Sequence, residues 1–62
     1  MNNINSWYEV SIELVNRKVH ILSTESMEEA ENKKKELSEV GIKVIIEEWK
    51  LTKEIPILMG EI

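Results

Sequence analysis

The chain has 62 residues, no cysteine and one histidine, and its twelve acidic and eight basic side chains give a formal charge of −4 at pH 7. A chain of this length is expected to form one domain, residues 1–62, and to bury only about 60% of its unfolded surface, so its stability should be marginal. The composition excludes disulfides and thiolate metal sites, and a single histidine does not support a zinc site. Association with a partner or a second copy remains a common source of stability for so small a protein.

The charge distribution does not favour direct nucleic-acid binding, which normally needs a stripe of basic residues to neutralise phosphates. The basic run Lys33-Lys34-Lys35 lies between Glu31 and Glu36, which is typical of a solvated helix face. No apolar segment approaches the roughly 18 residues of a membrane span, and no signal-peptide pattern is present. We therefore expect a cytoplasmic protein without a membrane partner.

Two strands are predicted in the N-terminal half. Residues 7–15 (WYEVSIELV) alternate between apolar and mostly polar side chains. Such period-2 alternation, rich in β-branched and aromatic residues, predicts a half-buried strand. After a short polar break of hairpin length, a second strand is predicted at about 18–24. There Leu22 is expected on the face opposite to Val19 and Ile21, because successive strand residues point to opposite faces.

One helix is predicted at about 27–40. Ser26 followed by Glu29 has the spacing of a capping box, in which the two side chains satisfy backbone N–H groups at a helix start. Gly41 stands where a left-handed residue commonly ends a helix. The apolar stripe between these ends is thin, so the helix is expected to cover one face of a small sheet and little more.

A third strand is predicted at about 42–51 (IKVIIEEWKL), which completes the order β-β-α-β. The connection through the helix is expected to be a right-handed crossover. If the third strand lies beside the first, all neighbouring strands are antiparallel. We therefore predict an α+β fold in which one helix covers a three-stranded antiparallel sheet of order 2-1-3, followed by an apolar tail at 54–62.

The face of the sheet that the helix does not cover is predicted to be unusually apolar. The alternation places both tryptophans of the chain there, where a half-solvated antiparallel sheet would be polar. Contiguous apolar patches on small proteins usually mark interaction sites, and Trp is enriched at binding hot spots. The candidate interface residues, for a dimer or for another partner, are Trp7, Leu22, Ile45, Trp49, Leu51, Ile55, Ile57, Leu58 and Met59.

The tail EIPILMGEI leaves two alternatives open. It either folds back over the uncovered face of its own chain, or it takes part with that face in an interface with another molecule. Pro56 disfavours a central strand, so an edge strand or an extended wrap is expected. We favour the interface, with the tail lying along a second copy, because a symmetric dimer that buries two such faces also supplies stability.

No pattern of catalytic, cofactor-binding or metal-binding residues is found. His20 has no nucleophile constellation near it in the sequence and is interpreted as a surface residue paired across strands, with Glu13 or Glu9. Glu47 and Glu48 are adjacent, so they point to opposite faces of a strand and do not share a site. Glycine occurs only at positions 41 and 60, and no phosphate-binding loop or metal-ligand spacing is present. We predict a protein that is not an enzyme and uses no cofactor.

The segments SWYEVSIELV, STESMEEAENKKKELSEVG and IKVIIEEWK, in a cysteine-free chain of 62 residues, resemble very small proteins of Bacillus-type phages. These include homodimeric inhibitors of the Hachiman defence system. The resemblance covers the whole chain and implies an anti-defence inhibitor that binds a bacterial immune protein in the host cytoplasm. It assigns no functional residue.

The residues themselves favour a small acidic homodimer that docks on a host or partner protein. This interpretation rests on two features of the small chain: its net negative charge and its apolar face with two tryptophans. The alternative is a structural or self-assembly module, or a small regulatory protein without an inhibitory role.

Overall fold

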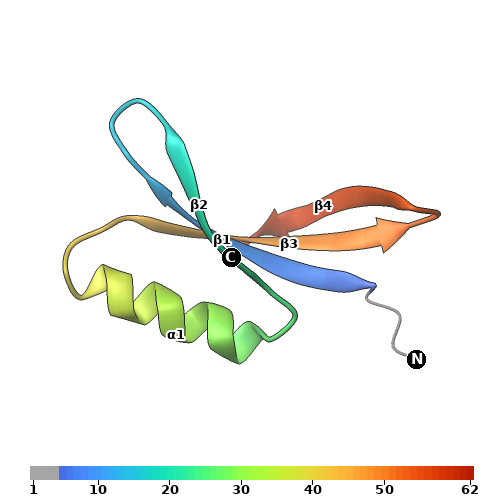
Figure 1. The fold of residues 1–62 in the computed structure, drawn as a ribbon, viewed down its shortest axis with the longest axis horizontal. Coiled ribbons are helices and arrows are strands. Elements are labelled where there is room, and N and C mark those ends of the chain that lie inside the picture. The colour runs from blue at the N-terminus through green and yellow to red at the C-terminus, as the bar shows by residue number, and fades with distance from the viewer. Residues whose placement is uncertain (1–4) are drawn as a thin grey trace.

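The computed structural model describes residues 5–62, which form four strands and one helix. In chain order these are β1 (Ser6–Glu13), β2 (Lys18–Thr24), α1 (Met27–Ser38), β3 (Val44–Thr52) and β4 (Ile55–Glu61). The strands form one antiparallel sheet in the order β2-β1-β3-β4 (Figure 1). The fold is α+β, but the predicted three-stranded sheet is wrong, because the apolar tail forms a fourth strand beside β3.

The fourth strand follows from a tight turn at Lys53 and Glu54. These residues have φ values of 49° and 67°, so both are in the left-handed region, as the central residues of a type I′ turn are. The twist of such a turn matches the twist of the flanking strands, and Thr52 accordingly lies opposite Ile55. The tail therefore extends the sheet of its own chain at the edge and does not fold over the uncovered face.

Pro56 lies at a position of β4 where the sheet needs no N–H. The backbone N–H of Leu51 donates to the carbonyl of Asn5, on the β1 side, at 2.7 Å. In an antiparallel pair the backbone of the opposite residue, here Pro56, then points away from β3 towards the free edge. A proline there interrupts no ladder hydrogen bond and removes a donor from the exposed edge.

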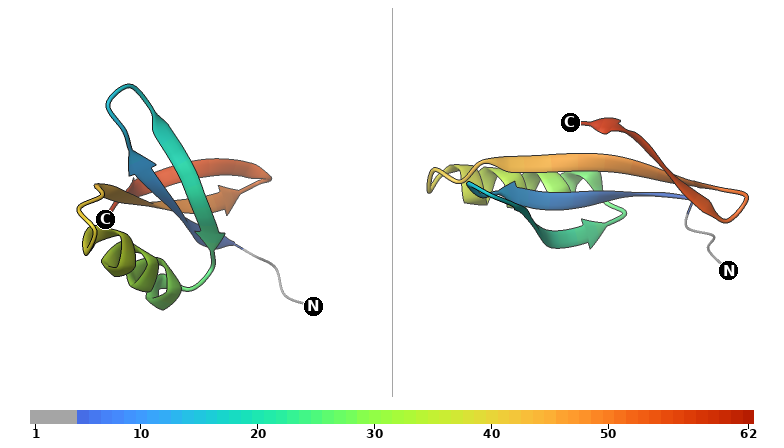
Figure 2. Two further views of the ribbon diagram at one scale, coloured as in Figure 1. Left: turned by 60° about the vertical axis from the view of Figure 1, so that its left-hand side comes forward. Right: turned by 90° about the horizontal axis from the view of Figure 1, so that it is seen from above.

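The helix packs across β1, β2 and β3 on one face of the sheet and does not reach β4 (Figures 1 and 2). The core beneath it is small. Among the described residues, the fully buried apolar side chains are Val10, Ala30 and Ile46, and the partly buried ones packed against them are Tyr8, Leu22 and Val44. So small a core agrees with the marginal stability expected of a short chain.

A β-bulge in the β1–β2 pair changes the face to which part of β2 points. Val10 lies opposite Leu22, whereas Ser11 lies opposite His20, so Ile21 is the extra residue. Leu22 consequently shares the helix-covered face with Val10 and packs against the core, while Ile21 is 40% exposed. The predicted placement of Leu22 on the uncovered face is wrong, because strict alternation takes no account of a bulge.

The C-terminal end of α1 is closed by two backbone hydrogen bonds. The N–H of Gly41 donates to the carbonyl of Ser38 at 3.0 Å, and the N–H of Ile42 donates to that of Leu37 at 3.2 Å. Together with the left-handed conformation of Gly41, at φ 83°, these are the bonds of a Schellman motif. The chain is thereby turned out of the helix and towards β3.

At the start of α1, Ser26 Oγ accepts the backbone N–H of Glu29 at 3.2 Å. The N–H of Ser26 donates to Thr24 Oγ1 at 3.0 Å, in place of the Glu29 carboxylate expected in a capping box. We expect Ser26→Ala to lower the free energy of unfolding by about 1 kcal/mol, measured by urea denaturation, because one helix N–H loses its acceptor. Ser26→Asn, which retains a capping oxygen, is the control, and an equal loss in both variants would contradict the capping role.

Candidate protein-binding face

We call the sheet surface opposite α1 the open face. Directly paired residues of neighbouring strands point to the same face, so the register defines its members. They are Trp7, Glu9, Ser11 and Glu13 of β1, Lys18, His20 and Ser23 of β2, Ile45, Glu47, Trp49 and Leu51 of β3, and Pro56, Leu58 and Glu61 of β4. Neither the helix nor the tail covers this surface (Figure 2).

The two tryptophans form a stacked pair on the open face. Trp7 and Trp49 are direct neighbours across β1 and β3, with ring centroids 6.3 Å apart and an interplanar angle of 8°. The indole N–H of Trp7 donates to Glu9 Oε2 at 2.9 Å. The indole N–H of Trp49 is buried and has no hydrogen-bond partner within the described part of the chain. Stacking and the Glu9 hydrogen bond hold the rings as a partly exposed aromatic platform.

Apolar side chains continue the platform along the β3–β4 hairpin. Trp49 lies opposite Leu58, and Leu51 lies opposite Pro56. Leu51 and Leu58 are 37% and 43% exposed, and Ile45 is half-buried further along β3. The predicted interface residues Trp7, Ile45, Trp49, Leu51 and Leu58 therefore lie together on the open face.

The remaining predicted interface residues of β4 lie elsewhere on the hairpin. Ile55 and Ile57 are paired with Thr52 and Lys50, so they point to the side of the sheet that carries α1. The hairpin extends beyond the helix, however, and both isoleucines are exposed there (Figure 1). Met59 is the extra residue of a bulge in the β3–β4 pair and is also exposed. We call Ile55, Ile57 and Met59 the hairpin patch.

Three carboxylates cross the open face in one row. Glu9 lies opposite Glu47, and Glu47 lies opposite Glu61, a juxtaposition of like charges that destabilises a sheet. Lys18 Nζ lies 3.2 Å from Glu47 Oε2 and balances one of these charges. Over residues 5–62, neither Glu9 nor Glu61 has an ion-pair partner. Sequence reasoning missed this acidic row because the position of Glu61 depends on the unexpected strand β4 and on its bulge at Met59.

A further ion pair lies near the β1–β2 end, where Lys43 Nζ is 2.9 Å from Glu13 Oε1. The hydrogen bond and the charge of Lys43 hold the pKa of Glu13 below its ordinary value, and Glu13 likewise raises the pKa of Lys43. The ionised Glu13 carboxylate therefore stabilises the folded protein at neutral pH. This stabilisation is lost as the pH falls through the pKa that Glu13 has in the folded protein. Both side chains are exposed, so the pair is a solvated surface contact.

His20 contacts a serine, not a carboxylate. Its Nε2 lies 2.8 Å from Ser23 Oγ, so the cross-strand partner expected from the sequence is wrong. The two side chains lie on an exposed strand, and the described residues supply no third group that orients the imidazole. A nucleophile–base pair would need such a group and donors for a developing oxyanion. The pair is a surface hydrogen bond.

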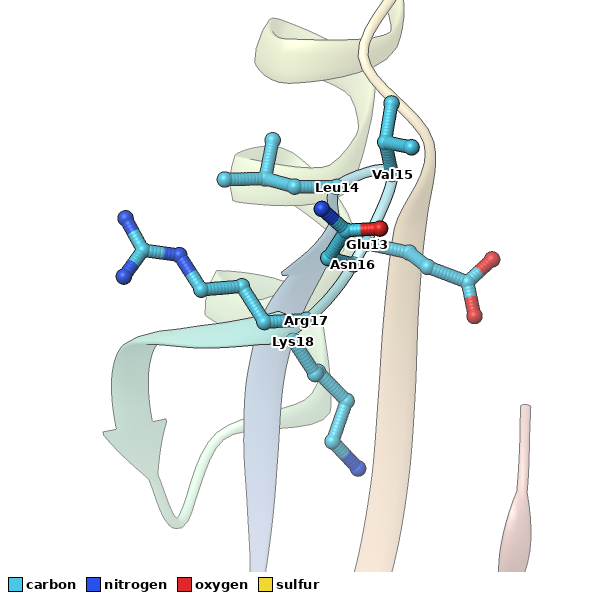
Figure 3. Close-up of a pocket in the computed structure, with 6 residues that line it drawn as sticks. All are labelled: Glu13, Leu14, Val15, Asn16, Arg17 and Lys18. Atoms are coloured by element: carbon cyan, nitrogen blue, oxygen red, sulfur yellow. The ribbon is translucent and has the colours of Figure 1, made fainter.

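A hollow with a volume of about 630 Å³ lies at the β1–β2 turn. Residues 13–18, which are the turn and the strand residue on each side of it, line it. Figure 3 shows that the side chains of Leu14, Arg17, Glu13 and Lys18 spread in different directions. A small-molecule site needs a few polar groups that converge on the ligand, which this loop does not provide.

A smaller hollow of about 240 Å³ adjoins the aromatic platform. Trp7 lines it together with Ser23, Thr24 and Glu25. The lining residues therefore lie at and just after the end of β2, beside the tryptophan of β1. We call it the Trp7 hollow.

Within residues 5–62, no cluster of His, Cys, Asp or Glu side chains is arranged to hold a metal ion. The same part of the chain contains no helix with the length and apolar character needed to cross a membrane. Comparisons with protein-family models, with curated proteins and with solved structures found no match.

Proposed function

We propose that this protein is a small acidic, non-enzymatic binding protein that acts in the cytoplasm and docks on a partner protein through the open face. The observation that carries the proposal is the stacked Trp7–Trp49 pair, which is partly exposed on the sheet face opposite α1. Rings held in this way present a large apolar area and lose little conformational freedom on binding, as hot-spot tryptophans do.

The proposal extends to inhibition of a host protein, because the chain resembles small phage proteins that act in this way. Binding that occupies a functional surface of the partner needs no chemistry from the inhibitor. The open face offers a platform for such a contact, and it requires no cofactor.

A homodimer is also part of the proposal. The three fully buried apolar side chains found among residues 5–62 make a small core, and the hairpin patch leaves Ile55, Ile57 and Met59 in contact with solvent. A second copy that covers this patch would add apolar burial to both chains. Ile55 and Ile57 of this patch point to the side opposite the open face, so dimerisation through them leaves the platform free for a partner.

Affinity capture from a bacterial lysate tests the proposal. Wild type is compared with Trp7→Ala/Trp49→Ala and with Leu58→Lys, which places a charge on an exposed position of the open face. Lys33→Ala/Glu36→Ala, which removes an exposed ion pair on α1, is the matched control. We expect wild type and control to recover the same protein and both open-face variants to lose at least about 90% of it, the tenfold effect of one hot-spot contact.

The recovered protein is then purified and titrated against wild type while tryptophan fluorescence is recorded. A shift in emission on binding places the contact at the platform, because both tryptophans of the chain lie there. Equal recovery by all four proteins, each shown by circular dichroism to be folded, would contradict binding through the open face.

A further inference from the structure

We propose that the partner segment bound by the open face is cationic, with an arginine or lysine side chain seated in the Trp7 hollow and further positive charge over Glu9 and Glu61. This inference rests on the proposed function and names the chemistry of the partner. Three features of the surface support it: the Trp7 hollow, the acidic row, and the proline and bulge that interrupt the β4 edge.

The walls of the Trp7 hollow match the parts of a long basic side chain. The indole of Trp7 attracts a cation held over its face, and it also packs against the apolar stem that carries the cation. Glu25, an exposed residue, also lines the hollow, and a carboxylate beside the indole would accept charge-assisted hydrogen bonds from a guanidinium or an ammonium group. A neutral or acidic side chain would use only part of this surface.

The acidic row destabilises the free sheet, but it would stabilise a complex with a cationic partner. In the free protein, Glu9 and Glu61 flank Glu47 without a cationic partner among the described residues. A segment with positive side chains lying across β1, β3 and β4 turns this repulsion into charge-assisted hydrogen bonds. Charge complementarity of this kind also speeds the encounter of the two molecules.

The same features argue against two other occupants of the open face. A second copy placed face to face would bring another acidic row to this surface, and like charges across an interface are unfavourable. A strand added to the free edge of β4 would meet Pro56, which lacks an N–H, and the bulge at Met59, both of which interrupt edge pairing. These features therefore favour the open face over the β4 edge as the place where the partner binds.

A defined pair of peptides tests the inference. The first is a short peptide that alternates arginine and leucine, and the second replaces each arginine by citrulline, which is uncharged and of similar shape. Binding is followed by tryptophan fluorescence and by the indole and amide signals in NMR spectra. We expect the arginine peptide to bind at least about tenfold more tightly than the citrulline peptide, and its affinity to fall as salt is added.

Variants locate the contact. Glu9→Gln/Glu61→Gln removes two charges from the acidic row, whereas Glu28→Gln/Glu31→Gln removes two from exposed positions of α1 and is the matched control. We expect the first to weaken binding of the arginine peptide about tenfold and the second by less than about twofold. The row variant should unfold at the same or a higher temperature than wild type, because it relieves repulsion between paired strands.

The inference is overturned if the arginine peptide does not bind, if both peptides bind equally, or if row and control variants weaken binding to the same extent. The proposed function has a separate test within the same experiment. Equal binding of both peptides that Trp7→Ala/Trp49→Ala abolishes would leave the open face as a docking surface and remove only its preference for cations. A dimer in sedimentation analysis that becomes a monomer in that variant would instead assign the open face to a second copy and contradict both.

Discussion

Ile46→Ala is expected to lower the free energy of unfolding by about 2–5 kcal/mol, because it deletes much of a fully buried side chain and leaves a cavity. Ile46 lies on β3 and forms the buried core with Val10 of β1 and Ala30 of α1. At roughly 0.05–0.15 kcal/mol per residue, a chain of this length has a total stability of about 3–9 kcal/mol. The variant should therefore be largely unfolded in urea concentrations that wild type withstands, as measured by circular dichroism.

Ile55→Ala is the matched control for this prediction. It makes the same substitution on β4, where the side chain is 62% exposed, and should change stability by less than about 1 kcal/mol. Equal losses in the two variants would contradict a core centred on Ile46. A larger loss for Ile55→Ala that grows with protein concentration would show that the hairpin patch is buried in a dimer.

Lys53→Asn/Glu54→Gly is expected to raise the free energy of unfolding by about 1–2 kcal/mol. Both residues adopt left-handed φ values, which are unfavourable for side chains other than glycine and, to a lesser degree, asparagine. Asn-Gly is the preferred pair for a type I′ turn, so the variant should stabilise the β3–β4 hairpin. Urea denaturation gives the change in stability, and slower amide exchange along β4 locates it.

The chain offers a matched control at Lys35 and Glu36, the same dipeptide in the last turn of α1. Lys35→Asn/Glu36→Gly should lower stability by about 1–2 kcal/mol, since asparagine and glycine are poor helix formers. Opposite signs in the two variants would show that the backbone conformation decides the effect. A loss of stability in Lys53→Asn/Glu54→Gly would contradict the left-handed turn and, with it, the placement of β4.

Several elements of the fold could be predicted because their causes are local. The alternating apolar and polar residues from Trp7 onwards predict a strand, and β1 lies there. Ser26 caps the start of α1, and Gly41 ends it. Hydrogen bonds at helix ends join residues only a few positions apart, so a short segment is enough to specify them. In an amphipathic strand, the alternation of apolar and polar residues likewise indicates which side faces the core.

The fourth strand could not be predicted in the same way. Lys53-Glu54 lacks the Asn-Gly signal of a two-residue hairpin, and Pro56 reads as a strand breaker. Pairing with β3 stabilises the strand and offsets the unfavourable turn, and the proline is tolerated because its backbone points to the free edge. The predicted three-stranded sheet failed at this point.

The sequence by itself determined that the chain is small, acidic and free of cysteine, that its helix follows a strand hairpin, and that its apolar residues exceed what one thin helix can cover. Only the tertiary structure decided which of those residues share a surface. Bulges at Ile21 and Met59 shift the strand register, which moves Leu22 into the core and aligns Glu61 with Glu47. Register depends on hydrogen bonds between segments far apart in the chain, and a slip of one residue exchanges the two faces of a strand.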